Sequence, residues 1–347
     1  CHFTWELGCS KNELMELLRN LQDVDQQTCT WLCHYYNLLG YIQQALGFNT
    51  EALMYLHKAE SVMEEQEKEE AGVRLQVNKA NLAWIYFYLG EMDKSKGYLE
   101  EVERLQQMHP APPGCTLHPE VSGEKGWTLV KFDKSKKRQA TDYFKMALKA
   151  EPERKEWHKG LAIAVSRAYI NHTCPPKLKD EILKQLKTAH ENEPNSLRLH
   201  ALYLEKLSEL QSANIEKEMQ DLLEKTLETK NLGGLGTILR YYRSISVDKG
   251  IEAAERAREK FPTSNRVLTH LANCYKWKVY KENIKENGTL AKKAIELFEE
   301  LVKHYPDSLR DKVTLASLHY YAQNSKRTEE IYEQLLLEKD DLPPYSQ

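Results

Sequence analysis

The chain has 347 residues, of which 41% are hydrophobic and 29% charged, a composition typical of a soluble globular or repeat protein. Its 49 basic and 52 acidic side chains leave a formal net charge of −3, which excludes a uniformly basic nucleic-acid binder but allows a local basic groove. No apolar run reaches the roughly 18 residues of a membrane-spanning helix, so we expect no membrane partner.

The cysteines indicate a reducing compartment. There are seven of them, an odd number, scattered along the chain without a C-x-x-C pair. The chain also opens at Cys1 with neither a methionine nor a signal peptide, so we expect a cytoplasmic protein and further residues before this point.

The first predicted element is an amphipathic helix from about Asn12 to Leu21. Arg19 lies near its end, where a cation interacts favourably with the helix dipole. That solvated helix-end position is the ordinary structural explanation of this arginine.

From Trp31 onward the pattern repeats as helix, glycine turn and second helix. Gly40 and Gly47 of the first unit recur as Ala83 and Gly90 in the next, at one constant spacing. A small residue lets a neighbouring helix approach, and the glycine ends the first helix of each pair. This is the signature of a tetratricopeptide repeat, whose basic unit is about 34 residues.

Prolines mark the later units, because each of four prolines follows one amphipathic helix and precedes another: Pro152, Pro194, Pro262 and Pro306. Between them we predict helix pairs at about 121–150, 155–192, 195–228, 231–261, 264–304 and 308–338. With the two earlier pairs, the chain is predicted to be all-α, a tetratricopeptide-repeat superhelix of about eight helix pairs. Such pairs cannot bury their apolar faces alone, so neighbours stack into one solenoid.

Two segments interrupt this rhythm and are predicted to be loops, a Pro/Gly-rich linker at 109–115 and a second loop at 169–176. We divide the chain into an N-terminal subdomain at 1–230 and a second subdomain at 231–347. We predict that the first subdomain carries the binding pocket and that the second continues a basic concave groove.

The stretch Gly126–Lys131 is predicted to form the first turns of a helix, with Trp127 and Lys131 on one face. A flat ring and a cation on one face can stack on a base and meet a phosphate. Packing in the core is the alternative for the tryptophan. The basic run Lys134–Arg138 that follows is predicted to be a turn, either solvated or facing a phosphate.

The chain resembles the interferon-induced proteins with tetratricopeptide repeats along essentially its whole length. The matching motifs, in order, include CHFTWEL at 1–7, NLLGY at 37–41, EKGW at 124–127, GLAIA at 160–164 and CYK at 274–276. The resemblance implies an interferon-induced, cytosolic, antiviral protein that holds the 5′ end of single-stranded RNA in a basic channel. It implies recognition of a 5′ triphosphate or an incompletely methylated cap, and sequestration of the RNA from translation without catalysis.

The resemblance also implies site residues. Trp127 falls on the tryptophan that stacks on the cap guanine, and Lys131 on the lysine beside it. Arg167 falls on the arginine that grips the 5′ phosphates, and Arg19 on an N-terminal arginine at the same end. The planar guanidinium fork suits phosphate oxygens.

Further along, Arg240 and Arg243 resemble the cations that follow the RNA backbone, and their spacing places them on one helix face. His270 falls where the family has a glutamine beside a histidine, and Thr269 replaces that histidine. Each of these residues also has an ordinary structural alternative, such as a helix cap or a core position.

Two departures favour a triphosphate over a cap. Lys137 stands where the family commonly has a tyrosine, which removes a stacking group and adds a cation. Leu197 stands at a second tyrosine position. The chain also ends earlier than its family usually does, so we expect either residues absent after Gln347 or a short member with a more open groove.

The main rival hypothesis is a tetratricopeptide scaffold that binds a peptide, translation factors or another family member. A homo-oligomer is compatible with either hypothesis. It predicts apolar anchors rather than converging cations. We predict no enzyme, cofactor or metal, because the sequence contains no nucleophile elbow, P-loop, H-E-x-x-H or metal-spaced Cys/His cluster.

Overall fold

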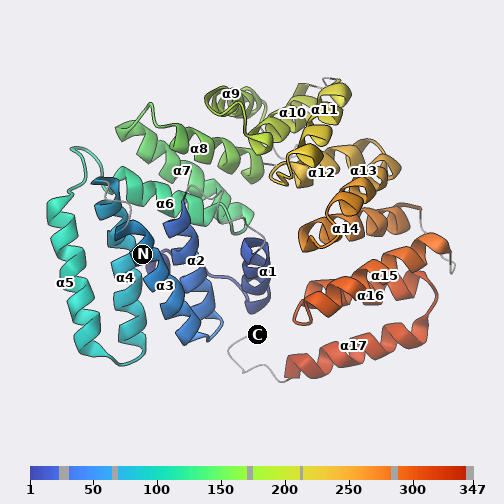
Figure 1. The fold of residues 1–347 in the computed structure, drawn as a ribbon, viewed down its shortest axis with the longest axis horizontal. Coiled ribbons are helices and arrows are strands. Elements are labelled where there is room, and N and C mark those ends of the chain that lie inside the picture. Colours follow the sequence, from blue (N-terminus) through green and yellow to red (C-terminus); the bar gives the residue numbers. More distant parts are fainter. Residues whose placement is uncertain (23–30, 65–68, 170–174, 212–213, 283–287, 341–347) are drawn as a thin grey trace. The chain divides into compact units, whose positions relative to one another are not determined.

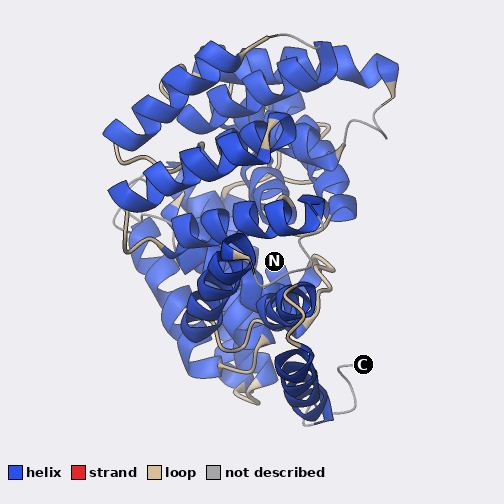
Figure 2. Ribbon diagram, turned by 90° about the vertical axis from the view of Figure 1, so that its right-hand side faces the viewer, coloured by secondary structure: helices blue, strands red, loops and turns tan. Residues whose placement is uncertain are grey.

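The computed structural model describes residues 1–22, 31–64, 69–169, 175–211, 214–282 and 288–340. In these ranges the chain is built of helices and loops, and no strand occurs (Figure 2). None of the described helices combines the length and the apolar character needed to cross a membrane. The predicted all-α class is confirmed.

The chain forms two compact units, of which the first comprises Cys1–Asn195 and Glu209–Ser212. Its elements are the short 3-10 helix η1 (His2–Thr4) and the helices α1 (Lys11–Gln22), α2 (Leu32–Ala45), α3 (Asn49–Glu64), α4 (Glu69–Tyr88), α5 (Met92–Met108), α6 (Pro119–Leu129), α7 (Lys134–Ala150), α8 (Lys155–Ala168) and α9 (Pro176–Asn192). Successive helices pack on one another, α2 on α3, α4 on α5, α6 on α7 and α8 on α9 (Figure 1).

The second unit comprises Ser196–Ser208 and Ala213–Gln347. Its helices are α10 (Leu197–Gln211), α11 (Glu216–Glu228), α12 (Leu235–Ile245), α13 (Val247–Lys260), α14 (Asn265–Glu282), α15 (Thr289–His304), α16 (Leu309–Tyr321) and α17 (Ser325–Asp340). One apolar core runs through the unit from α10 to α17. In the described residues, eight successive helix pairs therefore follow α1, as predicted. The functional division at 230/231 stays a prediction.

Glycines shape the hairpins as the repeat pattern predicts. Gly47 and Gly90 follow α2 and α4 with φ of +93° and +80°, a left-handed conformation that side chains disfavour. Gly40 lies where α3 crosses α2, and a Cβ atom there would come within 2.7 Å of the Leu56 side chain. The glycines thus set both the turn and the close approach of the paired helices.

One boundary in the first unit differs from the prediction. Gly126–Lys131 ends helix α6 rather than beginning a helix, because α6 starts at Pro119, which occupies its first turn behind the cap His118. Lys131 lies beyond the helix, in a turn where its N–H donates to the Thr128 carbonyl at 3.0 Å. The helical i, i+4 relation between Trp127 and Lys131 therefore does not hold.

The basic run 134–138 is also not a turn. It forms the start of α7, because Asp133 caps the helix and accepts hydrogen bonds from the backbone N–H groups of Ser135 and Lys136. The cations of this run therefore project from a helix, at fixed angles to one another.

Buried carboxylates fix α6 in the first unit. Glu120 is 2% exposed and accepts from Arg74 at 2.9 Å and from Arg154 at 2.8 Å. One helical turn later, Glu124 accepts from the Asn37 amide of α2 at 2.9 Å. These contacts tie the helix that carries Trp127 to α2, α4 and the segment before α8.

Candidate nucleic-acid interface

Trp127 lies on α6 and is largely buried, with 8% of its surface exposed. Its ring meets Phe144 of α7 edge-on, with centroids 5.3 Å apart and planes at 77°. The indole N–H is buried and finds no hydrogen-bond partner among the described residues. Most of the Trp127 ring is therefore packed in the core, as the structural alternative expects. A role of this tryptophan in base stacking stays a prediction.

Lys131 lines a cavity of about 230 Å³ between α1 and the turn after α6. The other lining residues come from both sides of this space: Cys9, Glu13, Glu16, Leu17, Asn20, Phe132 and Asp133. Burial and the nearby carboxylates of Glu13 and Asp133 raise the pKa of the Cys9 thiol to about 11. The cavity therefore combines one cation with acidic groups and is not a purely basic pocket.

Lys137 and Arg167 are two predicted site cations of the first unit that interact electrostatically with each other. Lys137, on the first turn of α7, donates from its ammonium group to the Phe132 carbonyl. Burial, and then the positive charge of Arg167, lower the pKa of Lys137, which Asp133 partly offsets. Arg167 lies exposed in the last turn of α8. Two cations that repel each other in this way would each gain from a bound anion.

Arg19 lies half-buried in the last turn of α1, as predicted for a helix-end cation. The same helix supplies Glu16 and Asn20 to the cavity at Lys131. Leu197, in contrast, is a buried core residue of the second unit. Its side chain packs in the apolar core of that unit.

In the second unit, Arg240 is held by a buried acid. Its guanidinium donates to both carboxylate oxygens of Glu205, at 2.5 and 2.8 Å, and Glu205 is 4% exposed. Such a bidentate pair fixes the arginine side chain and neutralises much of its charge. A role of Arg240 on the RNA backbone stays a prediction, and this pair weakens its physical basis.

Arg243 and His270 lie in one electrostatic neighbourhood. Burial lowers the pKa of His270 to about 3, and the charges of Arg266, Arg243 and Arg240 act in the same direction. Arg266 was missed in the sequence, although it stands four residues before His270 on α14 and therefore shares its face. The neutral imidazole can still offer one N–H to a phosphate oxygen.

We expect His270 to make stability depend on pH. The unfolded chain binds a proton at this residue below about pH 6.5, whereas the folded chain does so only near about pH 3, so stability falls as pH drops through that window. His270→Gln is expected to flatten the decline in the urea midpoint between about pH 7 and about pH 4. The exposed His304→Gln serves as the control, and an unchanged slope in the His270 variant would show that this residue is not the source.

The described helices and their pairing define an all-α tetratricopeptide-repeat protein. A family model described as "Tetratricopeptide repeat" matches residues 267–308, which run from α14 through α15 to the turn before α16. The chain is 28% identical over 357 aligned positions to the human "Antiviral innate immune response effector IFIT1", covering 98% of this chain and 74% of that protein. It is 30% identical to the human "Protein IFIT1 homolog B", over 80% of this chain and 59% of that protein.

Solved structures agree with the sequence relatives. The structure described as "Human IFIT1 dimer with PPP-AAAA" matches with a TM-score of 0.70 and 27% identity, covering 97% of this chain and 74% of that one. The structure "Human IFIT1 dimer with m7Gppp-AAAA" matches equally well, at a TM-score of 0.70 and 28% identity, over 97% of this chain and 75% of that one. The sequence relatives and the structural neighbours of this chain are thus interferon-induced proteins with tetratricopeptide repeats, to which it is similar over most of its length.

Proposed function

We propose that this protein is an antiviral effector that binds the 5′ end of single-stranded RNA and sequesters that RNA from translation. It recognises a 5′ triphosphate or an incompletely methylated cap, and its action requires no bond to be made or broken. Its proposed place of action is the cytoplasm, which imaging of a fluorescently tagged protein would test. IFIT1, which this chain resembles over nearly its whole length, has been solved with PPP-AAAA and with m7Gppp-AAAA.

The observation that carries this proposal is the pair of cations at Lys137 and Arg167. Burial lowers the pKa of Lys137, and the positive charge of Arg167 acts in the same direction. A dense anion such as a triphosphate would relieve this repulsion and accept several charge-assisted hydrogen bonds. The lysine at position 137 also adds a cation where the family commonly has a tyrosine, so the triphosphate is the favoured end.

The direct test compares three short RNAs of one sequence, carrying a 5′ triphosphate, a 5′ hydroxyl or an unmethylated cap. We expect the triphosphate RNA to bind at least about tenfold more tightly than the hydroxyl RNA, since each charge-assisted bond contributes about 1.5–3 kcal/mol. Fluorescence anisotropy at two salt concentrations measures this. Equal, weak binding of all three would contradict end recognition.

The tryptophan needs a conservative test because it is part of the core. Trp127→Ala would open a cavity against Phe144 and cost about 3–5 kcal/mol, which confounds any binding result. Trp127→Phe retains most of the packing, and we expect it to weaken capped RNA by up to about tenfold while leaving triphosphate RNA nearly unchanged. An equal loss for both RNAs would show that position 127 acts through packing.

A second candidate function, protein binding, is favoured by an exposed apolar surface at the α4–α5 turn. It exposes 40% of Trp84, 56% of Phe87, 65% of Tyr88 and 53% of Met92. Such a surface suits another copy of the chain or another family member. Light scattering at several protein concentrations tests it, with Phe87→Glu expected to abolish self-association made through this surface.

A further inference from the structure

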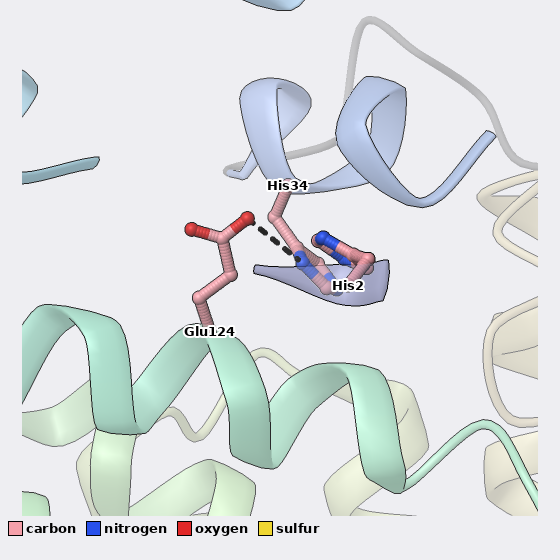
Figure 3. Close-up of side chains that lie close together, drawn as sticks. All are labelled: His2, His34 and Glu124. Carbon is pink, nitrogen blue, oxygen red and sulfur yellow. Dashed lines mark ion pairs between the residues drawn. The ribbon is translucent and has the colours of Figure 1, made fainter. Parts of the chain in front are cut away.

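Three buried side chains in the first unit converge from parts of the sequence that are far apart. They are His2 of η1, His34 of α2 and Glu124 of α6, exposed by 1%, 8% and 1% (Figure 3). Each offers one ligand atom, and these atoms all lie within 4.8 Å of one another. We propose that these three residues bind a divalent transition-metal ion, with Zn²⁺ as the best match to two imidazoles and a carboxylate.

The first reason is a buried carboxylate that forms no close ion pair. In the part of the chain that the structure describes, no lysine or arginine forms an ion pair with Glu124; His34 Nδ1 lies 3.8 Å from the carboxylate, and the N-terminal ammonium of Cys1 interacts with it electrostatically. Burying a carboxylate without a close, hydrogen-bonded cation is costly. Glu120, one turn earlier on the same helix, shows the contrast, because two arginines neutralise it.

The second reason is the unused capacity of His34. Both ring nitrogens of this buried side chain have no hydrogen-bond partner in the described residues. Buried polar nitrogens are normally paired, and an imidazole with a free lone pair is a common metal ligand. Figure 3 shows the ring turned toward Glu124, with His2 beside it.

Neighbouring side chains already hold the ligands in the manner of an outer shell. Asn37 donates to Glu124 at 2.9 Å and itself accepts from Asn78 at 2.9 Å. Such contacts orient ligand groups and raise the affinity of a metal site.

His2 is the ligand that must reorganise most. Its Nε2 lies 3.1 Å from the Thr128 hydroxyl and its Nδ1 lies 3.1 Å from the Asn81 amide. To ligate a metal through either ring nitrogen, His2 must give up one of these two contacts, and Asn81 stays oriented because its Oδ1 accepts from the His2 backbone N–H at 3.0 Å. The sequence did not reveal this site because metal ligands are usually recognised by short spacings, and these come from three separate elements.

Cobalt gives the test a direct spectroscopic readout. Wild-type protein is stripped with a chelator and titrated with Co²⁺, then with Zn²⁺. We expect one equivalent of Co²⁺ to produce visible d–d absorption that Zn²⁺ abolishes, and Zn²⁺ to raise the thermal unfolding midpoint. His34→Phe keeps the ring volume and removes only unpartnered nitrogens, so it should fold normally and lose metal affinity by at least about 100-fold. Glu124→Gln retains an oxygen that can accept from Asn37, and it should lose metal affinity to a similar extent.

The matched control is His319→Phe in the second unit. His319 is also buried, at 6% exposed, and both of its ring nitrogens lack a partner among the described residues. It belongs to no cluster of potential metal ligands in the described chain, so this variant should bind Co²⁺ like the wild type. The proposal is overturned if wild-type protein gives no such absorption, or if His34→Phe binds Co²⁺ as tightly as His319→Phe.

Discussion

Arg167→Ala is expected to weaken binding of 5′-triphosphate RNA by about 10–100-fold, because one charge-assisted hydrogen-bonding group contributes about 1.5–3 kcal/mol. Arg167 lies exposed at the end of α8 beside Lys137, where a phosphate would relieve the repulsion of the two cations. The variant should also lose about one unit of the dependence of log Kd on log salt concentration. Its folding stability should change by no more than about 0.5 kcal/mol, since an exposed position makes a small contribution.

Two further variants make this result specific. Arg167→Lys keeps the charge but loses the planar fork, so we expect a smaller loss than in the alanine variant. Arg104→Ala removes another exposed arginine, on α5, and should leave affinity unchanged within about twofold. If Arg104→Ala weakens binding as much as Arg167→Ala, the RNA responds to net charge and no phosphate pocket exists at Arg167.

The fold could be predicted because its determinants are local. Gly47 and Gly90 end helices in a conformation that other residues disfavour. This signal lies in the local sequence and does not depend on contacts with distant residues. The predicted start of α6 is wrong, and the reason is also local. The stretch 126–131 is predicted to be the first turns of a helix, whereas the helix begins at Pro119 behind His118, and histidine is not among the usual capping residues.

The candidate site was harder to predict because its electrostatics depend on distant partners. Arg240 is a basic residue on the expected helix, but Glu205, 35 residues earlier, determines how much of its charge remains available. Trp127 similarly stands at the expected position, while its burial depends on Phe144 of the next helix. Spacing within a helix predicts which residues share a face, but not which residues of another helix that face meets.

Glu120→Ala is expected to destabilise the first unit strongly, costing about 3–5 kcal/mol of unfolding free energy. The carboxylate is 2% exposed and neutralises Arg74 and Arg154 together. The Arg74 guanidinium also lies over the Trp31 ring, 4.3 Å from its centroid, so it cannot easily turn to solvent. Removing the Glu120 carboxylate leaves the positive charges of Arg74 and Arg154 close together without the negative charge that neutralises them.

Urea unfolding followed by circular dichroism measures this loss, with Glu103→Ala on the exposed face of α5 as the control expected to change stability by less than about 0.5 kcal/mol. Because α6 also carries Trp127, the RNA affinity of Glu120→Ala should be measured as well. We expect it to fall only in proportion to the fraction of protein that is unfolded. Affinity corrected for that fraction should equal the wild-type value, whereas a residual loss would mean that Glu120 positions the binding residues in the folded state. A urea midpoint within error of the wild type would instead show that the ion pairs of Glu120 with Arg74 and Arg154 contribute no net stability, because their attraction only offsets the cost of removing the charges from water.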